Sequence, residues 1–134
     1  MAKKKIKILT VDDEIGIISF LYDFFVARDF EVLQATNGKE ALNIIRKEKP
    51  PIVLLDIKLG RGMSGIDVLK EIRGIDKDIK VIMMTGVKDK DVTDEAMGLG
   101  ATDYITKPLS LAYLDKVVLL KALNLQMKDL AKGD

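Results

Sequence analysis

Residues 51–65 read PIVLLDIKLGRGMSG, an apolar run that ends in one carboxylate and continues into a glycine-rich turn. The four consecutive apolar residues 52–55 are typical of a parallel strand that is covered on both faces. An ionised carboxylate is costly inside such a layer, so we expect Asp56 where the strand leaves it, at the edge of the sheet. A lone Asp often only begins a turn, so a functional role for Asp56 depends on which other side chains reach the same edge.

The rest of the chain alternates short apolar runs with segments of helical periodicity. Besides the central strand, we predict strands at residues 6–11, 30–35, 81–85 and 103–106. We predict helices between the turn at 36–38 and the prolines at 50–51, and at 15–27, 66–75, 89–99 and from the N-cap Ser110 to about residue 131. Five strands that alternate with five helices favour an α/β fold with a parallel sheet and right-handed crossovers. We expect a single domain, residues 1–134, with its core at about residues 5–125.

Composition excludes several classes of site. The 134-residue chain has 22 basic and 21 acidic residues and a formal charge of +1, which gives no overall reason to bind nucleic acid. Cysteine and histidine are both absent, which excludes disulfides, thiolate or imidazole metal ligation and a Ser-His-Asp triad. The remaining oxygen ligands, carboxylates and carbonyls, suit Mg²⁺ or Ca²⁺. No apolar run approaches the roughly 18 residues of a membrane span, and we expect a cytoplasmic protein.

The carboxyl ends of parallel strands meet at one edge of the sheet, where ligands bind in this class of fold. The residues predicted at that edge are Asp12, Asp13, Asp56, Thr85 and Lys107. Three crowded carboxylates repel each other unless a divalent cation neutralises them, whereas a lysine and a threonine can bind the oxygens of a transferring phosphoryl group. Asp56, alone on the central strand, is the natural nucleophile for an aspartyl phosphate. Each residue alone could be an ordinary loop residue, but the set at strand ends in this order favours phosphoryl chemistry.

Over residues 5 to about 125, the chain resembles the response-regulator receiver domain of bacterial two-component signalling. The motifs that carry this resemblance are VDDE at 11–14, LLDIKL at 54–59, GMSG at 62–65, MMTG at 83–86 and DYITKP at 103–108. The resemblance implies a flavodoxin-like fold, in which a five-stranded parallel sheet of order 2-1-3-4-5 has five helices on both faces. It also implies a signalling switch that catalyses its own phosphoryl transfer and dephosphorylation, and not a metabolic enzyme.

The resemblance assigns the acidic residues to phosphoryl acceptance and to a magnesium site. Asp56 would be the phospho-acceptor, and Asp13 would ligate Mg²⁺ directly together with Asp56. Asp12 would act largely through water, and the backbone carbonyl of Lys58 would be a further ligand. Because the chain has no histidine, the phosphohistidine donor must belong to a partner, either a histidine kinase or a histidine phosphotransfer protein.

The resemblance also assigns the residues of the switch. Thr85 and Lys107 would bind the phosphoryl oxygens, and Tyr104 would be the switch aromatic. The peptide bond between Lys107 and Pro108 would be cis, an isomer that proline tolerates. Phosphorylation would then change the surface formed by the fourth helix, the fifth strand and the fifth helix. One departure from the family is the run Gly60-Arg61-Gly62, which is one residue longer than usual and lacks the usual proline, so we expect a more mobile loop.

Three other functions are alternatives to a phosphorylated receiver. Residues 60–65 match GxGxxG, but a dinucleotide fingerprint belongs to the first strand–helix turn and is followed by an acid at the next strand's end, where this chain has Thr85. A magnesium-dependent phosphatase with an aspartate nucleophile usually has a second acid two positions later, where this chain has Lys58. A receiver-like interaction module that never takes a phosphoryl group is the third alternative, and the intact set of Asp56, Thr85 and Lys107 counts against it.

The last helix carries two apolar stripes. At about 100° per residue, one face holds Leu111, Leu114, Val118, Ala122 and Leu125, and we expect it to pack on the sheet. A second stripe holds Leu119, Leu123, Met127 and Leu130, and it continues where the first turns polar. We therefore expect a homodimer seam, or the start of a coiled-coil connection to an output domain. A few exposed leucines on a frayed helix end are the simpler alternative.

Overall fold

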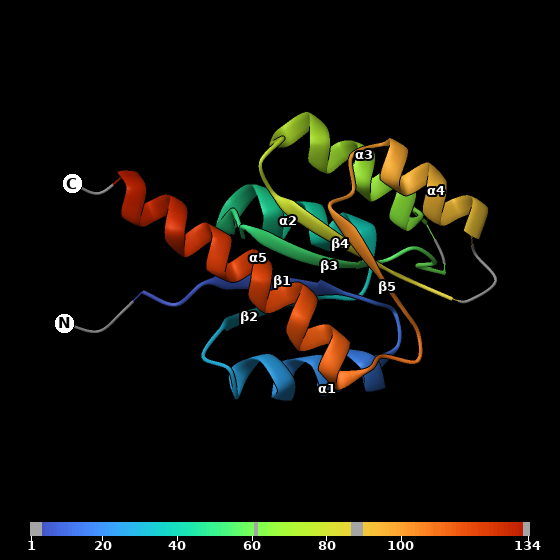
Figure 1. Ribbon diagram of the computed structural model, residues 1–134. Coiled ribbons are helices and arrows are strands. Elements are labelled where there is room, and N and C mark those ends of the chain that lie inside the picture. The colour runs from blue at the N-terminus through green and yellow to red at the C-terminus, as the bar shows by residue number, and fades with distance from the viewer. Residues whose placement is uncertain (1–3, 61, 87–89, 133–134) are drawn as a thin grey trace.

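The computed structural model describes residues 4–60, 62–86 and 90–132, which alternate between strands and helices (Figure 1). The elements are β1 (Lys7–Val11), α1 (Ile15–Val26), β2 (Glu31–Ala35), α2 (Gly38–Glu48), β3 (Ile52–Asp56), α3 (Gly65–Ile75), β4 (Lys80–Thr85), α4 (Lys90–Gly98), β5 (Asp103–Thr106) and α5 (Leu111–Lys132). Every predicted strand and helix is present, and the predicted ends differ from the observed ones by a few residues at most.

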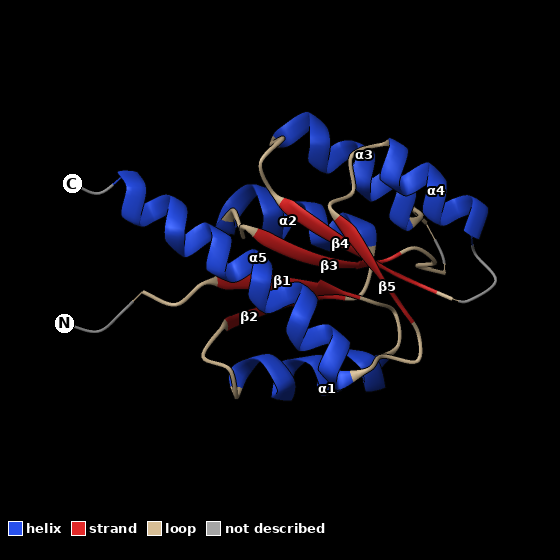
Figure 2. Cartoon of the chain, viewed as in Figure 1, coloured by secondary structure: helices blue, strands red, loops and turns tan. Residues whose placement is uncertain are grey.

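The five strands form one parallel sheet of order β2-β1-β3-β4-β5 (Figure 2). This confirms the predicted flavodoxin-like α/β fold. The central strand is β3, which pairs with β1 on one side and with β4 on the other. Its last residue is Asp56, which lies beside Met84 of β4. The carboxylate that ends the apolar run therefore lies at the middle of the sheet's carboxyl edge.

The sheet is buried on both faces, because successive side chains of a strand point to opposite sides. In β4, Val81 and Met83 pack into the core layer beneath α2, α3 and α4, whereas Ile82 and Met84 pack into the layer beneath α1 and α5. Both layers contain side chains that are completely buried. The same alternation sends Thr85, the last residue of β4, toward the face that carries α4.

Helix α5 follows most of its predicted pattern. Leu114, Val118 and Ala122 are buried against the sheet, and Leu125 packs on their cluster. The expectation for Leu111 was wrong, since this side chain is 52% exposed. Leu111 is the first residue of the helix, and α5 meets the sheet only about one turn later.

Ser110 begins α5 as predicted, because its hydroxyl oxygen accepts a hydrogen bond from the Tyr113 amide at 3.4 Å. In the second stripe, Leu119 is 41% exposed. The side chains of Leu123, Met127 and Leu130 lie outside the described residues. Neither α5 nor any other helix in the described part of the chain has the length and apolar character needed to cross a membrane.

Candidate functional site

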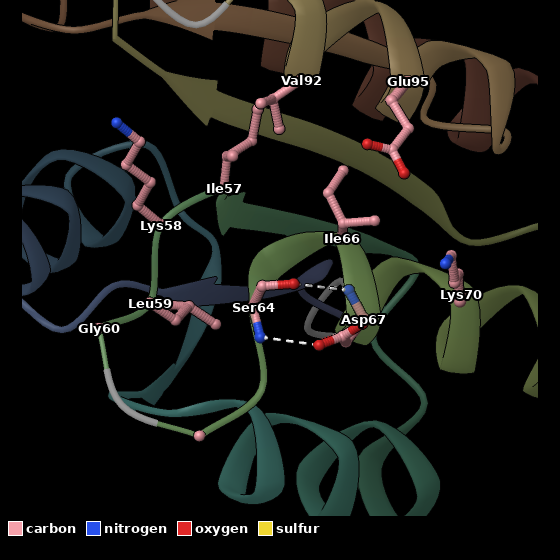
Figure 3. Close-up of a pocket in the computed structure, with 11 residues that line it drawn as sticks. Ile57, Lys58, Leu59, Gly60, Ser64, Ile66, Asp67, Lys70, Val92 and Glu95 are labelled. Carbon is pink, nitrogen blue, oxygen red and sulfur yellow. Dashed lines mark hydrogen bonds between the residues drawn. The ribbon is translucent and has the colours of Figure 1, made fainter.

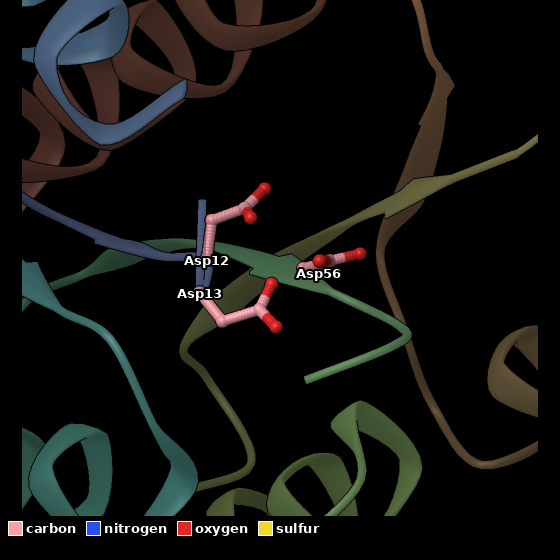
Figure 4. A group of neighbouring side chains, drawn as sticks. All are labelled: Asp12, Asp13 and Asp56. Carbon is pink, nitrogen blue, oxygen red and sulfur yellow. The ribbon is translucent and has the colours of Figure 1, made fainter. Parts of the chain in front are cut away.

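Three carboxylates meet where the neighbouring strands β1 and β3 end (Figure 4). Asp12 and Asp13 follow β1, and Asp56 ends β3. One oxygen atom from each carboxylate lies within 4.8 Å of the others. Asp12 and Asp56 are buried, with 0% and 6% of their surface exposed, whereas Asp13 is exposed. The structure thus brings together the three acids that the strand-end pattern predicted.

Lys107 reaches this acidic group from the loop that follows β5. Its Nζ atom lies 2.8 Å from Oδ2 of Asp12, 3.4 Å from Oδ2 of Asp56 and 3.8 Å from Oε1 of Glu14. The Lys107 amide donates a hydrogen bond to the Thr85 carbonyl at 2.8 Å, and the Lys107–Pro108 peptide bond is cis. Burial acts to lower the pKa of Lys107, but the hydrogen bond to Asp12 and the negative charge of Asp56 outweigh it and hold that pKa above its usual value.

Electrostatics at the site centre on Asp56. Burial, with the added repulsion of the Asp12 carboxylate, raises the pKa of Asp56 from 3.8 to about 6. The charge of Lys107 and the Lys58 amide, which donates to Oδ1 of Asp56 at 3.2 Å, act in the opposite direction. The single positive charge of Lys107 does not neutralise three carboxylates. The atoms that the three acids offer to a metal ion are all oxygens. This donor set fits a hard divalent cation such as Mg²⁺, which needs only one or two protein carboxylates.

The loop between β3 and α3 lies directly against the acids. Gly60 has a φ of 64°, and a Cβ atom at this position would lie 2.7 Å from Oδ2 of Asp13. At Gly65, a Cβ atom would lie 2.2 Å from the Asp56 carbonyl oxygen, and the Gly65 amide donates to the Ile57 carbonyl at 2.9 Å. These contacts account for Gly60 and Gly65 by close packing against Asp13 and Asp56, and Gly62 has a φ of 83° that favours glycine, so none of the three requires a nucleotide fingerprint. Arg61 lies outside the described residues, so the expected mobility of this loop stays a prediction.

The first turn of α3 is held by a capping box (Figure 3). The Ser64 hydroxyl oxygen accepts from the Asp67 amide at 3.1 Å, and the Asp67 carboxylate accepts from the Ser64 amide at 3.2 Å. Beside this turn is a cavity of about 660 Å³ between the loop, α3 and α4, with Val92 and Glu95 on the α4 side. The acids of the site do not line this cavity.

Thr85 and Tyr104 are among the residues that line a separate cavity of about 260 Å³ next to α4. The Thr85 side chain is buried, and its hydroxyl lies 3.0 Å from the hydroxyl of Thr93 and 3.3 Å from the Gly86 carbonyl, to which it donates. Tyr104 is 42% exposed. Among the described residues, no hydrogen bond joins the Thr85 hydroxyl to Asp56 or to Lys107.

Sequence reasoning did not identify Thr93. It shares the buried side of α4 with Ala96, three residues later, and this spacing was visible in the sequence. Nothing in the sequence, however, distinguished one threonine in a weakly apolar helix from an ordinary surface threonine.

Comparison with known proteins identifies relatives with the same architecture. The family model for the response regulator receiver domain matches residues 8–119. Sporulation initiation phosphotransferase F from Bacillus subtilis (strain 168) is 43% identical over 105 residues, which are 78% of this chain and 84% of that protein. Regulatory protein AtoC from Escherichia coli (strain K12) is 38% identical over 120 residues, which are 90% of this chain but 26% of that protein. The chain therefore spans about a quarter of the length of this second relative.

A solved structure agrees with both sequence matches. The crystal structure of a response regulator receiver domain protein (CheY-like) from Methanospirillum hungatei JF-1 superposes with a TM-score of 0.86 at 29% identity. The superposition covers 94% of this chain and 99% of the other.

Proposed function

Because this chain belongs to the response regulator receiver domain family, a family of signalling modules, we propose that it is a switch that takes a phosphoryl group onto Asp56 with Mg²⁺. The observation that carries the proposal is the position of the Asp56 carboxylate. It is buried at the end of the central strand, beside two further acids and 3.4 Å from the Lys107 ammonium. Such a carboxylate can act as a nucleophile toward phosphorus, while the cations near it meet the charge of the phosphoryl oxygens.

The phosphoryl donor is the phosphohistidine of a partner, a histidine kinase or a histidine phosphotransfer protein. An Asp56 oxygen attacks the phosphorus, the new O–P bond makes an acyl phosphate, and the P–N bond to the partner's imidazole breaks as that imidazole takes up a proton. The pKa of about 6 leaves Asp56 mainly ionised at neutral pH, as the attack requires. In the second half of the cycle, water attacks the phosphorus and the O–P bond to Asp56 breaks. Inorganic phosphate and a proton are released, and the free carboxylate is regenerated.

Mg²⁺ would be held by Asp13 and Asp56 directly, by Asp12 largely through water, and by the backbone carbonyl of Lys58. Bound there, the ion supplies positive charge between the carboxylates and the phosphoryl oxygens. Lys107 binds a further phosphoryl oxygen, and its ammonium already contacts the two buried acids Asp12 and Asp56.

We further propose that Thr85 and Tyr104 transmit the signal. The Thr85 hydroxyl moves toward the phosphoryl oxygens, and Tyr104 turns inward into the cavity that both residues line. The surface of α4, β5 and α5 changes as a result. A ligand shifts such an equilibrium only through contacts that differ between the two states, and the Thr85–phosphoryl hydrogen bond is one of them.

The second stripe of α5 supports a proposal about assembly. Leu119 is exposed in the part of the helix whose side chains are described, and the helix continues to Lys132. We propose that this stripe forms a homodimer seam or connects to an output domain, and that the protein acts in the cytoplasm without direct binding to nucleic acid.

Intact-mass spectrometry tests the proposed phosphorylation. The wild type is incubated with acetyl phosphate, with and without Mg²⁺, beside Asp56→Asn and the matched control Asp29→Asn. Asp29 is an exposed acid outside the site, and its φ of 69° is one that asparagine adopts readily. We expect the wild type and Asp29→Asn to gain one phosphoryl group in a magnesium-dependent manner and Asp56→Asn to gain none. An unchanged wild-type mass, or a gain that survives Asp56→Asn, refutes the proposal.

A further inference from the structure

Five polar side chains are buried among the described residues, and two of them, Thr10 and Thr93, have no role in the proposed function. The set is Thr10, Asp12, Asp56, Thr85 and Thr93. The first lies within β1, and the next three belong to the strand-end site. Thr93 lies on α4, with only 6% of its surface exposed. A buried hydroxyl is costly unless it is hydrogen-bonded, so its partner is informative.

Thr85 is a hydrogen-bond partner of Thr93. The two hydroxyl oxygens are 3.0 Å apart, and the pleat of β4 turns Thr85 toward the face that carries α4. The hydroxyl of Thr85 also donates to the Gly86 carbonyl at 3.3 Å. Either hydroxyl can be the donor in the contact between Thr85 and Thr93. In this structure, the hydroxyl that should bind the phosphoryl group is therefore engaged by α4.

We propose that Thr93 is a positioning residue that holds Thr85 on the α4 side and so sets how readily a phosphoryl group at Asp56 recruits it. This inference rests on the proposed function. To donate to a phosphoryl oxygen, Thr85 must withdraw its proton from Gly86 and move away from Thr93. The hydrogen bond to Thr93 stabilises the unphosphorylated state alone, so phosphorylation and the position of α4 compete for one hydroxyl.

Thr93→Val is the decisive variant, because valine keeps the shape of threonine and replaces the hydroxyl with a methyl group. After the substitution, Thr85 still has the Gly86 carbonyl as an acceptor for its proton. The loss of one net hydrogen bond from the unphosphorylated state corresponds to roughly a fivefold change in an equilibrium constant. Thr93→Ser keeps the hydroxyl and should behave as the wild type.

The experiment titrates the whole protein with beryllofluoride, a phosphoryl mimic, in the presence of Mg²⁺. Amide NMR spectra report the half-saturating concentration, and a separate titration reports the affinity for Mg²⁺ alone. We expect Thr93→Val to bind beryllofluoride about fivefold more tightly than the wild type, with unchanged Mg²⁺ affinity. Without beryllofluoride, the amide signals of α4 and β5 in Thr93→Val should lie partway toward their bound positions.

Two controls separate this positioning role from a merely structural one. Thr10, on β1, has a buried hydroxyl that donates to the Leu33 carbonyl at 3.4 Å, and it is far along the chain from α4. Thr10→Val removes this hydroxyl and should leave beryllofluoride affinity unchanged. In a Thr85→Ala background, adding Thr93→Val should have no effect, because the partner hydroxyl is gone. Thermal unfolding of each variant confirms that it is folded, and Thr93→Ala replaces Thr93→Val if the valine variant does not fold.

The outcomes are distinct. A wild type that binds no beryllofluoride overturns the proposed function, and this inference with it. If the wild type binds but Thr93→Val binds equally well or more weakly, the inference alone is overturned. The same holds if the effect of Thr93→Val persists without the Thr85 hydroxyl.

Discussion

The Nζ atom of Lys107 lies 2.8 Å from Oδ2 of Asp12, and this contact joins the ends of β5 and β1, two strands that do not pair. The lysine passes the end of β3 to do so, and there it also comes within 3.4 Å of the Asp56 carboxylate. A single ammonium thus partly neutralises two buried acids. The stability of the site without metal therefore depends on this lysine.

We expect Lys107→Met to destabilise the metal-free protein by about 2 kcal/mol or more at pH 7.5, because two buried carboxylates lose their shared cation. Urea unfolding in EDTA measures the change. Lys7→Met is the matched control, since Lys7 forms an ion pair with Glu48 at 3.0 Å outside the site, with side chains 30% and 32% exposed, and it should change stability less. Equal stability losses for the two variants would contradict the assigned role of Lys107.

The pH dependence of stability should be set in part by Asp56. Its pKa is about 6 in the folded chain against an ordinary value of 3.8, so the folded state binds this proton more tightly than the unfolded state. Stability from this group is therefore greatest below about pH 4, falls as the pH rises to about 6 and stays lower above it.

Asp56→Asn removes this penalty. At pH 7.5 in EDTA we expect the variant to be more stable than the wild type by up to about 3 kcal/mol, and the difference should nearly vanish at pH 4. Urea unfolding across this range measures both curves. The control Asp29→Asn should show no comparable dependence on pH. A variant that is less stable than the wild type at pH 7.5 would show that the ionised Asp56 carboxylate does not destabilise the folded protein.

Substituting alanine for each of two glycines of α3 should change the stability of the protein in opposite directions. At Gly65 the new Cβ atom would lie 2.2 Å from the Asp56 carbonyl oxygen, so backbone must move, and we expect a loss of about 2 kcal/mol or more. At Gly74 the Cβ position has no atom within 4 Å apart from neighbouring residues and the backbone of the same helix, and alanine should stabilise the helix by up to about 1 kcal/mol. Thermal unfolding compares them, and Gly65→Ala should also lose phosphorylation by acetyl phosphate. A Gly65→Ala protein as stable as Gly74→Ala would refute the packing argument.

The second stripe of α5 predicts self-association. Sedimentation of the wild type and of Leu123→Asp, each with and without beryllofluoride, should show a dimer that the aspartate abolishes, because a charge in an apolar seam is costly. Leu111→Asp is a suitable control, since Leu111 is exposed and lies outside that stripe. A wild type that stays monomeric at all concentrations in both states rules out the homodimer.

Much of this protein was predictable because its signals are local. The uninterrupted apolar run of β3, the alternation of strands and helices, and the breaks at glycine and proline specify a parallel α/β sheet. In such a sheet, residues that end strands must share one edge, so the grouping of Asp12, Asp13 and Asp56 followed from their positions in the sequence. The physical reason is that hydrophobic periodicity and backbone geometry act over a few neighbouring residues.

Tertiary structure alone decided the contacts between elements far apart in the chain. Helical angles put Leu111 on the buried face, but the place where α5 meets the sheet left it exposed. The distances from Lys107 to the acids and the pairing of Thr85 with Thr93 depend on how β5 and α4 are placed beside β4. Such contacts arise from packing across crossovers, where burial makes one hydrogen bond or one charge matter, and no local pattern in the sequence encodes them.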